Sequence, residues 1–312
     1  MQIFVSGSLA YDRIMDFPGR FADHILPEKI HLLNVCFMVN GLTERFGGTA
    51  GNIAYNLHML GEQAVILATA GRDFGPYRRW LDRLNLPLHG IRVIEEEFTA
   101  SAYITTDLAD NQITGFNPGA MRHPSGYEFD GDDPGGSLAI IAPGNLEDML
   151  HYSRRYKELG IPYIFDPGQS IPAFGPAELR EMADGALAVI MNDYEQEMFR
   201  KKTGLSEADL QGLAQVLIIT KGEEGSELLT AGGREIVPPA RPRHVQDPTG
   251  AGDAYRAGLI KGLVLNLPWG TAALMASTLA SFAVEQAGTQ EHQVTLTDFW
   301  RRYRDNFGAP PV

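Results

Sequence analysis

Residues 247–253 read DPTGAGD and lead into a run of small residues. A Gly-Ala-Gly turn that opens a helix leaves several backbone N–H groups unpaired and directed at one point, with the positive end of the helix dipole behind them. We therefore predict that Gly250, Ala251 and Gly252 bind an anion. Asp253, in the first turn of the same helix, is placed to accept a proton from a reacting hydroxyl. Taken alone, the motif also fits a simple tight turn before a helix.

The chemistry that such a turn favours is phosphoryl transfer. A phosphoryl group in transfer spreads negative charge over its equatorial oxygens, and backbone N–H groups stabilise that charge without a lysine clamp. The sequence contains neither the GxxxxGK(S/T) run of P-loop enzymes nor the His-Arg-Asp loop of protein kinases. Its His and Cys spacing predicts no zinc site.

Elsewhere the chain alternates apolar runs with stretches that suit helices. This succession favours an α/β fold with a parallel sheet covered on both faces. No repeat or low-complexity tract interrupts it, so we expect residues 1–312 to form a single domain. The predicted strands lie at 3–5, 64–68, 138–141, 163–165, 187–191 and 216–220, and the predicted helices at 52–60, 146–159, 177–183 and 194–202.

Two segments, residues 13–46 and residues 95–118, break this alternation. In the second, apolar and polar residues alternate from position 98 to position 105, as in a strand with two different faces. We predict that the two segments form a small β-sheet lid inserted in the main domain. Ligands of open parallel sheets bind at the carboxyl ends of the strands, where such a lid would close.

Composition excludes several classes of partner. A formal net charge of -13 without a basic run argues against nucleic acid and anionic membranes, both of which require clustered Lys and Arg. The single Cys36 cannot form an intramolecular disulfide, and the first residues are typical of a strand rather than a signal peptide, so we expect a cytoplasmic protein. The apolar stretch 272–284 is shorter than the roughly 20 residues of a bilayer-spanning helix.

A second glycine-rich stretch, FGGTAGNIA, occupies residues 46–54. Glycines such as Gly48 let a substrate approach the backbone closely, and Asn52 offers a donor and an acceptor to a sugar diol. Residues 47–71 and 247–260 together resemble, in spacing and order, the two signatures of the ribokinase-like (PfkB) family of carbohydrate kinases. The resemblance implies a three-layer α/β/α fold with a central mainly parallel sheet and a small β-sheet lid, and ATP-dependent phosphorylation of an alcohol group.

Further motifs resemble the nucleotide and metal sites of this family. The NDYE run from Asn192 to Glu195 is similar to the motif that acts through Mg²⁺ and its waters near the nucleotide phosphates. TKGEEG at 220–225 is similar to the loop that lies against the ribose and phosphates of ATP. The acidic residue that opens the second signature helps to hold a monovalent cation in the family, so Asp247 and the backbone near Gly288 are the implied ligands of K⁺. The implied ATP-contacting residues are Asn192, Thr220, Lys221, Gly222 and Gly225.

The resemblance covers nearly the whole chain and is closest to bacterial adenosine kinases of the mycobacterial type. In that group an Asp that matches Asp12 binds the sugar hydroxyls, which suits a carboxylate because it accepts two hydrogen bonds from a vicinal diol. Two aromatic residues of the lid sandwich the purine there, and their counterparts would be Phe116 and Tyr103. The group tends to carry a second Gln where this chain has Ser170, next to Gln169. The implied substrate-binding residues are Ser8, Asp12, Gly48, Asn52, Tyr103, Phe116, Gln169 and Phe37.

The predicted lid also implies a homodimer. Residues 34–39 are apolar on both faces of a strand, and such a segment is costly to expose on a lid. In the related enzymes the lids pair, and the Phe that matches Phe37 reaches into the neighbouring site.

We therefore expect a kinase that phosphorylates the 5′-hydroxyl of a nucleoside, most simply adenosine in purine salvage. One alternative is the same chemistry on another nucleoside or on a free sugar such as ribose or fructose. Another is a catalytically idle nucleoside-binding regulatory protein, although such a protein would have no physical need for Asp253, Asn192 and Glu195 together.

Overall fold

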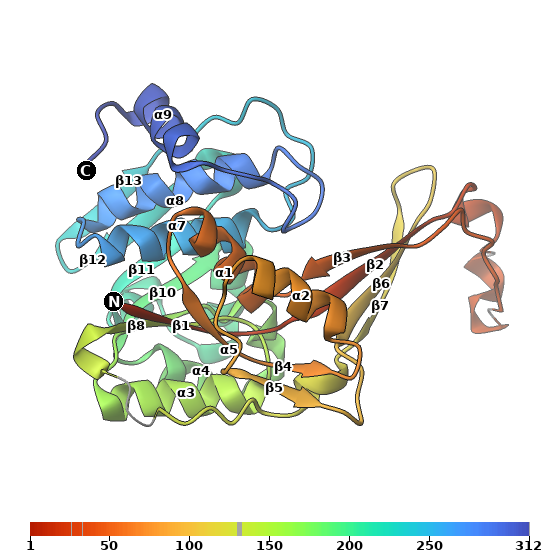
Figure 1. Ribbon diagram of the computed structural model, residues 1–312, viewed down its shortest axis with the longest axis horizontal. Coiled ribbons are helices and arrows are strands. Elements are labelled where there is room, and N and C mark those ends of the chain that lie inside the picture. Colours follow the sequence, from red (N-terminus) through yellow and green to blue (C-terminus); the bar gives the residue numbers. More distant parts are fainter. Residues whose placement is uncertain (26, 33, 130–132, 312) are drawn as a thin grey trace.

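The computed structural model describes residues 1–25, 27–32, 34–129 and 133–311. Figure 1 shows a large sheet between two layers of helices, and a smaller sheet that projects from one side and ends in a long extension. Both chain termini lie on the far side of the molecule from that extension (Figure 1). No helix among the described residues has the length and apolar character needed to cross a bilayer.

The main sheet has nine strands among the described residues, in the order β13-β12-β11-β10-β9-β8-β1-β4-β5. Its strands pair in parallel from β11 to β5, and β12 and β13 are antiparallel at one edge. The predicted mainly parallel sheet is thus confirmed, and it contains all six predicted strands. The strands are β1 (Gln2–Ser6), β4 (Ala64–Gly71), β5 (Ile91–Ile94), β8 (Ser137–Ile141), β9 (Tyr163–Phe165), β10 (Ala186–Asn192), β11 (Ala214–Thr220), β12 (Ser226–Thr230) and β13 (Gly233–Val237).

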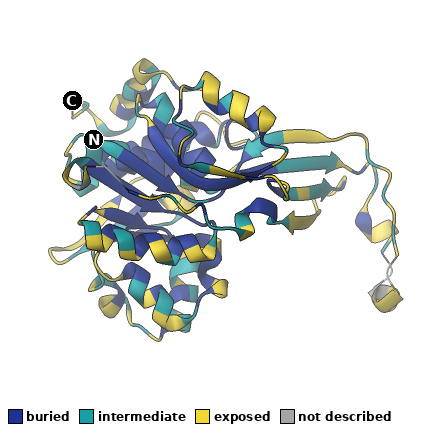
Figure 2. Cartoon of the chain, turned by 60° about the horizontal axis from the view of Figure 1, so that its bottom comes forward, coloured by how far each residue is buried: buried dark blue, intermediate teal, exposed yellow. Residues whose placement is uncertain are grey.

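The central strands bury both of their faces, as Figure 2 shows for the centre of the molecule, whereas the edge strands β5 and β13 are largely exposed. Because side chains alternate along a strand, Ile3 and Val5 of β1 join one core and Phe4 joins the other. Helices α1 (Thr49–Met59), α2 (Gly75–Arg83), α7 (Ala251–Val264), α8 (Trp269–Ala283) and α9 (Leu296–Phe307) contribute to the first core. Helices α3 (Leu146–Leu159), α4 (Pro176–Ala183), α5 (Asp193–Thr203) and α6 (Glu207–Gln211) contribute to the second.

The small sheet has the strand order β3-β2-β6-β7. Its central pair, β2 and β6, is parallel, and both outer pairs are antiparallel. The strands come mainly from the two segments that break the alternation of the main sheet, although the first strand begins three residues before residue 13. They are β2 (Ala10–Asp16), β3 (Thr43–Gly47), β6 (Ala100–Thr106) and β7 (Gln112–Asn117). Between β2 and β3, the described part of residues 17–42 forms the extension, which contains short 3₁₀ turns rather than strands.

Candidate functional site

A cleft of about 900 Å³ opens at the carboxyl ends of the parallel strands. Its walls are formed by the residues that follow β1, β8, β9, β10 and β11, by the first turns of α1 and α7, and by the small sheet. The predicted site residues that line it are Ser8, Asp12, Gly48, Asn52, Phe116, Gln169, Asn192, Glu195, Thr220, Gly222, Gly250, Gly252 and Asp253. Residues far apart in the sequence therefore meet at one place.

A second cavity of about 740 Å³ adjoins the cleft. The two share Thr220, Gly222 and Gly252 in their linings. Gly225 and Ala251 line the second cavity. Two molecules bound in the two cavities would meet at the turn before α7.

This turn has the geometry of an anion-binding helix start. Gly250 has a φ angle of 82°, in the left-handed region that favours glycine. The N–H of Ala251 donates to the carbonyl of Pro248 at 3.2 Å, so that donor is already engaged. The N–H groups of Gly252 and Asp253 lie in the first turn, where the helix offers them no carbonyl. An anion in the cleft can therefore accept hydrogen bonds from this turn.

Asp247 ties the turn to the segment that follows α8. Its Oδ1 accepts the N–H of Thr249 at 2.9 Å, and its Oδ2 accepts the N–H of Gly288 at 3.0 Å. Burial opposes the charged carboxylate, but these hydrogen bonds prevail and lower the pKa of Asp247. A Cβ atom on Gly250 would lie 3.0 Å from Cγ2 of Thr289, so the same segment packs directly against the turn.

Asp253 lies between the turn and α1. Nδ2 of Asn52 donates to Oδ2 of Asp253 at 2.8 Å. Burial raises the pKa of Asp253 to about 6, although Arg256 and the Asn52 hydrogen bond favour the charged form. A carboxylate with this pKa is ionised at pH 7 and still basic enough to accept a proton from a reacting hydroxyl.

Two charged residues of the cleft, Asp166 and Arg256, were not predicted as site residues. Nη2 of Arg256 donates to Oδ1 of Asp166 at 2.7 Å, and both residues are buried. Burial raises the pKa of Asp166, opposed by the charge of Arg256. A Cβ atom on Gly252 would lie 2.7 Å from Nη1 of Arg256, so a positive charge lies directly against the turn. The available signal was an Arg one turn after Asp253 in a helix that is otherwise rich in small and apolar residues.

The other wall of the cleft brings the β1–β2 connection against the start of α1. Gly48 has a φ angle of 89°, and a Cβ atom there would lie 2.5 Å from the carbonyl oxygen of Ser8. The N–H of Thr49 donates to Oγ of Ser8 at 3.0 Å, and the N–H of Ser8 donates to Oγ1 of Thr49 at 3.1 Å. On β2, burial raises the pKa of Asp12 against the opposing charge of Arg45.

The register of the small sheet decides which side chains face the cleft. Asp12 pairs with Ala102, and Ala102 pairs with Phe116. Paired residues of neighbouring strands point to the same face, so these three share the cleft face. Tyr103 is one residue further along β6 and points to the opposite face. The predicted sandwich of Tyr103 and Phe116 is therefore wrong, because the two rings lie on opposite faces of the sheet.

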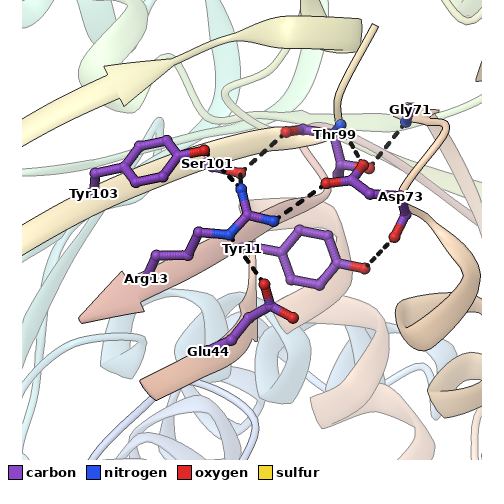
Figure 3. Close-up of polar contacts among 8 residues, drawn as sticks. All are labelled: Tyr11, Arg13, Glu44, Gly71, Asp73, Thr99, Ser101 and Tyr103. Carbon is purple, nitrogen blue, oxygen red and sulfur yellow. Dashed lines mark hydrogen bonds and ion pairs between the residues drawn. The ribbon is translucent and has the colours of Figure 1, made fainter. Parts of the chain in front are cut away.

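Figure 3 shows Tyr103 and its partner Arg13 on the outer face of the small sheet, with the other partners of Arg13. Nη1 of Arg13 donates to the Tyr103 hydroxyl at 2.8 Å and to Oγ of Ser101 at 2.9 Å. Nη2 of Arg13 pairs with Asp73 at 3.2 Å, and its Nε pairs with Glu44 at 3.0 Å. We call these five residues the Arg13 cluster. It joins three strands of the small sheet to the loop that follows β4.

Asn192 and Glu195 form the start of α5. Oδ1 of Asn192 accepts the N–H of Glu195 at 2.7 Å, and Oε2 of Glu195 accepts the N–H of Asn192 at 2.8 Å. Burial raises the pKa of Glu195, opposed by this N–H. Among the described residues, no group of three or more His, Cys, Asp or Glu side chains could hold a metal ion. The carboxylate of Glu195 and the amide of Asn192 offer oxygen atoms, the kind of ligand that Mg²⁺ takes.

Two further predicted residues line neither cavity. Nζ of Lys221 pairs with Glu227 at 2.5 Å, which turns this side chain toward β12. Phe37 packs in the extension against Phe17 and Phe21, with ring centroids 4.8 and 5.0 Å away. Contact of Phe37 with a neighbouring site stays a prediction.

Over most of its length the chain is similar to nucleoside kinases. A nucleoside kinase from Methanocaldococcus jannaschii is 32% identical over 271 residues, which are 86% of this chain and 88% of that protein. A crystal structure of a nucleoside kinase from the same organism has a TM-score of 0.86 and 30% identity, and the match covers 98% of this chain and 99% of that one. The structure of Burkholderia thailandensis nucleoside kinase in complex with inosine has a TM-score of 0.87 and 39% identity, and 99% of each chain is covered.

These structures confirm the predicted ribokinase-like fold. The model of the pfkB family carbohydrate kinases matches residues 19–296. The chain belongs to the pfkB family of carbohydrate kinases, which are phosphotransferases with an alcohol group as acceptor.

Proposed function

We propose that the chain transfers the γ-phosphoryl group of MgATP to the 5′-hydroxyl of a nucleoside, and that adenosine is its preferred acceptor. The observation that carries this proposal is the position of Asp253 in the cleft, next to Gly252, where the two cavities meet. The similar structures of a nucleoside kinase with inosine and with ADP-inosine support a purine nucleoside as acceptor. The resemblance to adenosine kinases supports adenosine.

The acceptor would bind in the first cavity. Asp12 and Asn52 line the cleft with acceptor and donor atoms that suit the 2′- and 3′-hydroxyls of ribose. Phe116 is 53% exposed on the cleft face, which leaves its ring free to stack on a base. Gln169 offers an amide to the polar edge of the base, and the short side chain of Ser170 beside it leaves space for a water molecule.

In the proposed reaction, Asp253 accepts the proton of the 5′-hydroxyl as that oxygen forms a bond to the γ-phosphorus. The bond from the γ-phosphorus to the bridging oxygen breaks, and ADP leaves. The free N–H groups of Gly252 and Asp253, at the turn of Gly250, Ala251 and Gly252, stabilise the charge on the transferred group, and Arg256 beside the turn adds a positive charge.

The nucleotide would lie with its base in the second cavity. Thr220 and Gly222 line both cavities, so the loop after β11 can contact the ribose and the phosphates. Lys221 would contribute through its backbone only. Asn192 and Glu195 would hold Mg²⁺ through water, and the ion would neutralise charge on the phosphates. Asp247 and the backbone of Gly288 would hold K⁺, which predicts faster turnover in potassium than in tetramethylammonium salts.

A homodimer joined through the extension is part of the same proposal. Leu32, Met38 and Leu42 of the extension are 72%, 86% and 61% exposed, respectively. Apolar side chains gathered on a projecting segment favour a protein partner. Sedimentation of the wild type and of a Met38→Asp variant would test it: a dimer is expected for the first and a monomer for the second.

The competing functions differ in the acceptor or in catalysis itself. A kinase for a free sugar would use the same turn and Asp253, but it would gain nothing from a base next to Phe116. An idle binding protein would bind a nucleoside and transfer nothing. Neither of these functions is favoured, because one cleft is lined both by the exposed Phe116 and by the intact catalytic turn.

The deciding experiment incubates the protein with MgATP, K⁺ and adenosine, inosine, ribose or fructose, and follows ADP release. Adenosine should be turned over fastest, and Asp253→Asn should remove activity while nucleoside binding, measured by calorimetry, persists.

Because only the ionised Asp253 accepts a proton, kcat/KM should fall as the pH decreases through about 6. Near-wild-type turnover by Asp253→Asn would refute the mechanism, and faster turnover of another acceptor would refute the choice of adenosine.

A further inference from the structure

A series of buried and partly buried hydrogen bonds leads from α2 to Asp253. Nε1 of Trp80 donates to Oε1 of Gln290 at 2.9 Å. Nε2 of Gln290 donates to Oδ1 of Asn52 at 3.0 Å, and Nδ2 of Asn52 donates to Oδ2 of Asp253 at 2.8 Å. Three side chains thus connect a surface helix to the carboxylate at the centre of the cleft.

Trp80 determines which atom of each amide donates and which accepts in this series of hydrogen bonds. An indole N–H can only donate, so the atom of Gln290 that faces Trp80 must be its oxygen. The hydroxyl of Tyr77 donates to the carbonyl of Gly47 at 2.8 Å and accepts from Nε2 of Gln290 at 2.7 Å. Both partners therefore require the amino group of Gln290 to point toward Asn52. Asn52 must then offer its oxygen to Gln290 and its amino group to Asp253.

The surroundings leave little freedom for other arrangements. Asn52, Tyr77 and Gln290 are all less than 5% exposed, so water does not compete for their hydrogen bonds. A Cβ atom on Gly51 would lie 1.9 Å from the Tyr77 hydroxyl and 3.1 Å from Nε2 of Gln290. A glycine in α1 is therefore needed for these two side chains to approach Asn52.

Gln290 also belongs to the segment that braces the anion-binding turn. Gly288 donates to Asp247, and Thr289 packs against Gly250. The hydroxyl of Thr289 donates to the carbonyl of Phe46 at 3.1 Å. Three successive residues thus contact the turn, the end of β3 and Asn52, which keeps the two sides of the cleft in a fixed relation.

We propose that Gln290 is a positioning residue for the phosphoryl transfer, which orients the amide of Asn52 so that its amino group, and not its oxygen, faces Asp253. Without Gln290 the amide of Asn52 can rotate and present its oxygen to the Asp253 carboxylate, which disfavours the ionised base. This inference rests on the proposed role of Asp253 as the base, but on no particular acceptor.

The test is a double-mutant cycle that combines Gln290→Met with Asn52→Ala. Gln290→Met should lower kcat/KM on the order of tenfold in the wild-type background, because the hydrogen bond from Asn52 to the charged Asp253 is weakened. The same substitution should have little further effect on kcat/KM when residue 52 is already Ala, because the amide that connects Gln290 to Asp253 is then missing. An equal fold-change in both backgrounds would overturn the proposal, because a general loss of packing would act in both.

A second readout separates this proposal from the function on which it rests. The titration of Asp253, followed by NMR of its carboxyl carbon, should move to higher pH in Gln290→Met, while the other groups that act on it, Arg256 and Asp166, are unchanged. Trp80→Phe keeps an aromatic ring and removes only the indole donor, so it should shift the titration less, in the same direction. An unshifted titration in folded Gln290→Met overturns the proposal. A shifted titration in a protein that phosphorylates no acceptor supports the positioning role and refutes the proposed function.

Discussion

The two faces of the small sheet are made by the same strands and have opposite characters. On the cleft face, Asp12 and Phe116 border an open cavity, with the small Ala102 between them. On the outer face, Arg13 and Tyr103 are held in a dense polar cluster (Figure 3). One face therefore fixes the position of the sheet, so that the other can keep its side chains available for a ligand.

The outer face is tied to the main domain through Asp73, which follows β4. Oδ1 of Asp73 accepts the N–H of Thr99 at 2.7 Å, and its Oδ2 pairs with Arg13. The hydroxyl of Tyr11 donates to the carbonyl of Asp73 at 2.9 Å. Burial opposes the charged carboxylate, but the hydrogen bonds from Thr99 and Arg13 prevail and lower the pKa of Asp73. The cluster thus anchors β2 and β6 on the side away from the cleft.

The largest expected effect is on the cleft face, from Asp12→Ala. The loss of a carboxylate that accepts two hydroxyl hydrogen bonds should lower kcat/KM for the nucleoside about a hundredfold or more, at about 1.5 to 3 kcal/mol for each charged hydrogen bond. Steady-state kinetics measures this. Asp16→Ala is the matched control, because Asp16 lies on the same strand and face but farther out and exposed. Equal losses in the two variants would show that Asp12 does not touch the acceptor.

The next effect is on the outer face, from Arg13→Met. The substitution leaves the carboxylates of Asp73 and Glu44 without their guanidinium partner, and it should cost about 2 kcal/mol of unfolding free energy because the pair is partly buried. Denaturant unfolding measures the loss. The KM for the nucleoside should rise only a few-fold, since Asp12 itself remains. Arg13→Lys keeps the charge but loses the forked donors of the guanidinium group. Its unfolding free energy should lie between those of the wild type and Arg13→Met. Unchanged unfolding in Arg13→Met would mean that the cluster does not anchor the sheet.

The third variant, Ala102→Phe, places a second ring beside Phe116 on the cleft face. An added aromatic contact is worth about 1 kcal/mol, so the KM for a nucleoside should fall roughly fivefold while the KM for ribose stays the same. Kinetics with both acceptors measures the difference. An equal change for ribose and the nucleoside would contradict the placement of the base next to Phe116.

The sequence allowed much of this arrangement to be predicted, but not the side chains of the small sheet. The parallel sheet and the turn at Gly250 could be predicted, because long apolar runs and a glycine motif report local structure directly. The sandwich with Tyr103 could not be placed correctly, because an alternating strand does not reveal which of its faces meets the cleft, and a shift of one residue exchanges them. Arg256 was missed because its partner, Asp166, lies 90 residues away.

The smallest effect is expected from Tyr103→Phe, which is the direct test of the corrected face. The substitution removes one hydroxyl that accepts from Arg13, and Arg13 keeps Ser101, Asp73 and Glu44 as partners. It should cost about 0.5 to 1 kcal/mol of unfolding free energy, because the site is partly exposed and the ring remains. The KM for the nucleoside should not change, whereas Phe116→Ala should raise it several-fold.

If instead Tyr103→Ala, which removes the whole ring, raised this KM as much as Phe116→Ala does, Tyr103 would have to contact the base. The register of β6 forbids that contact within one chain, so such a result would place the base against the outer face of a second copy.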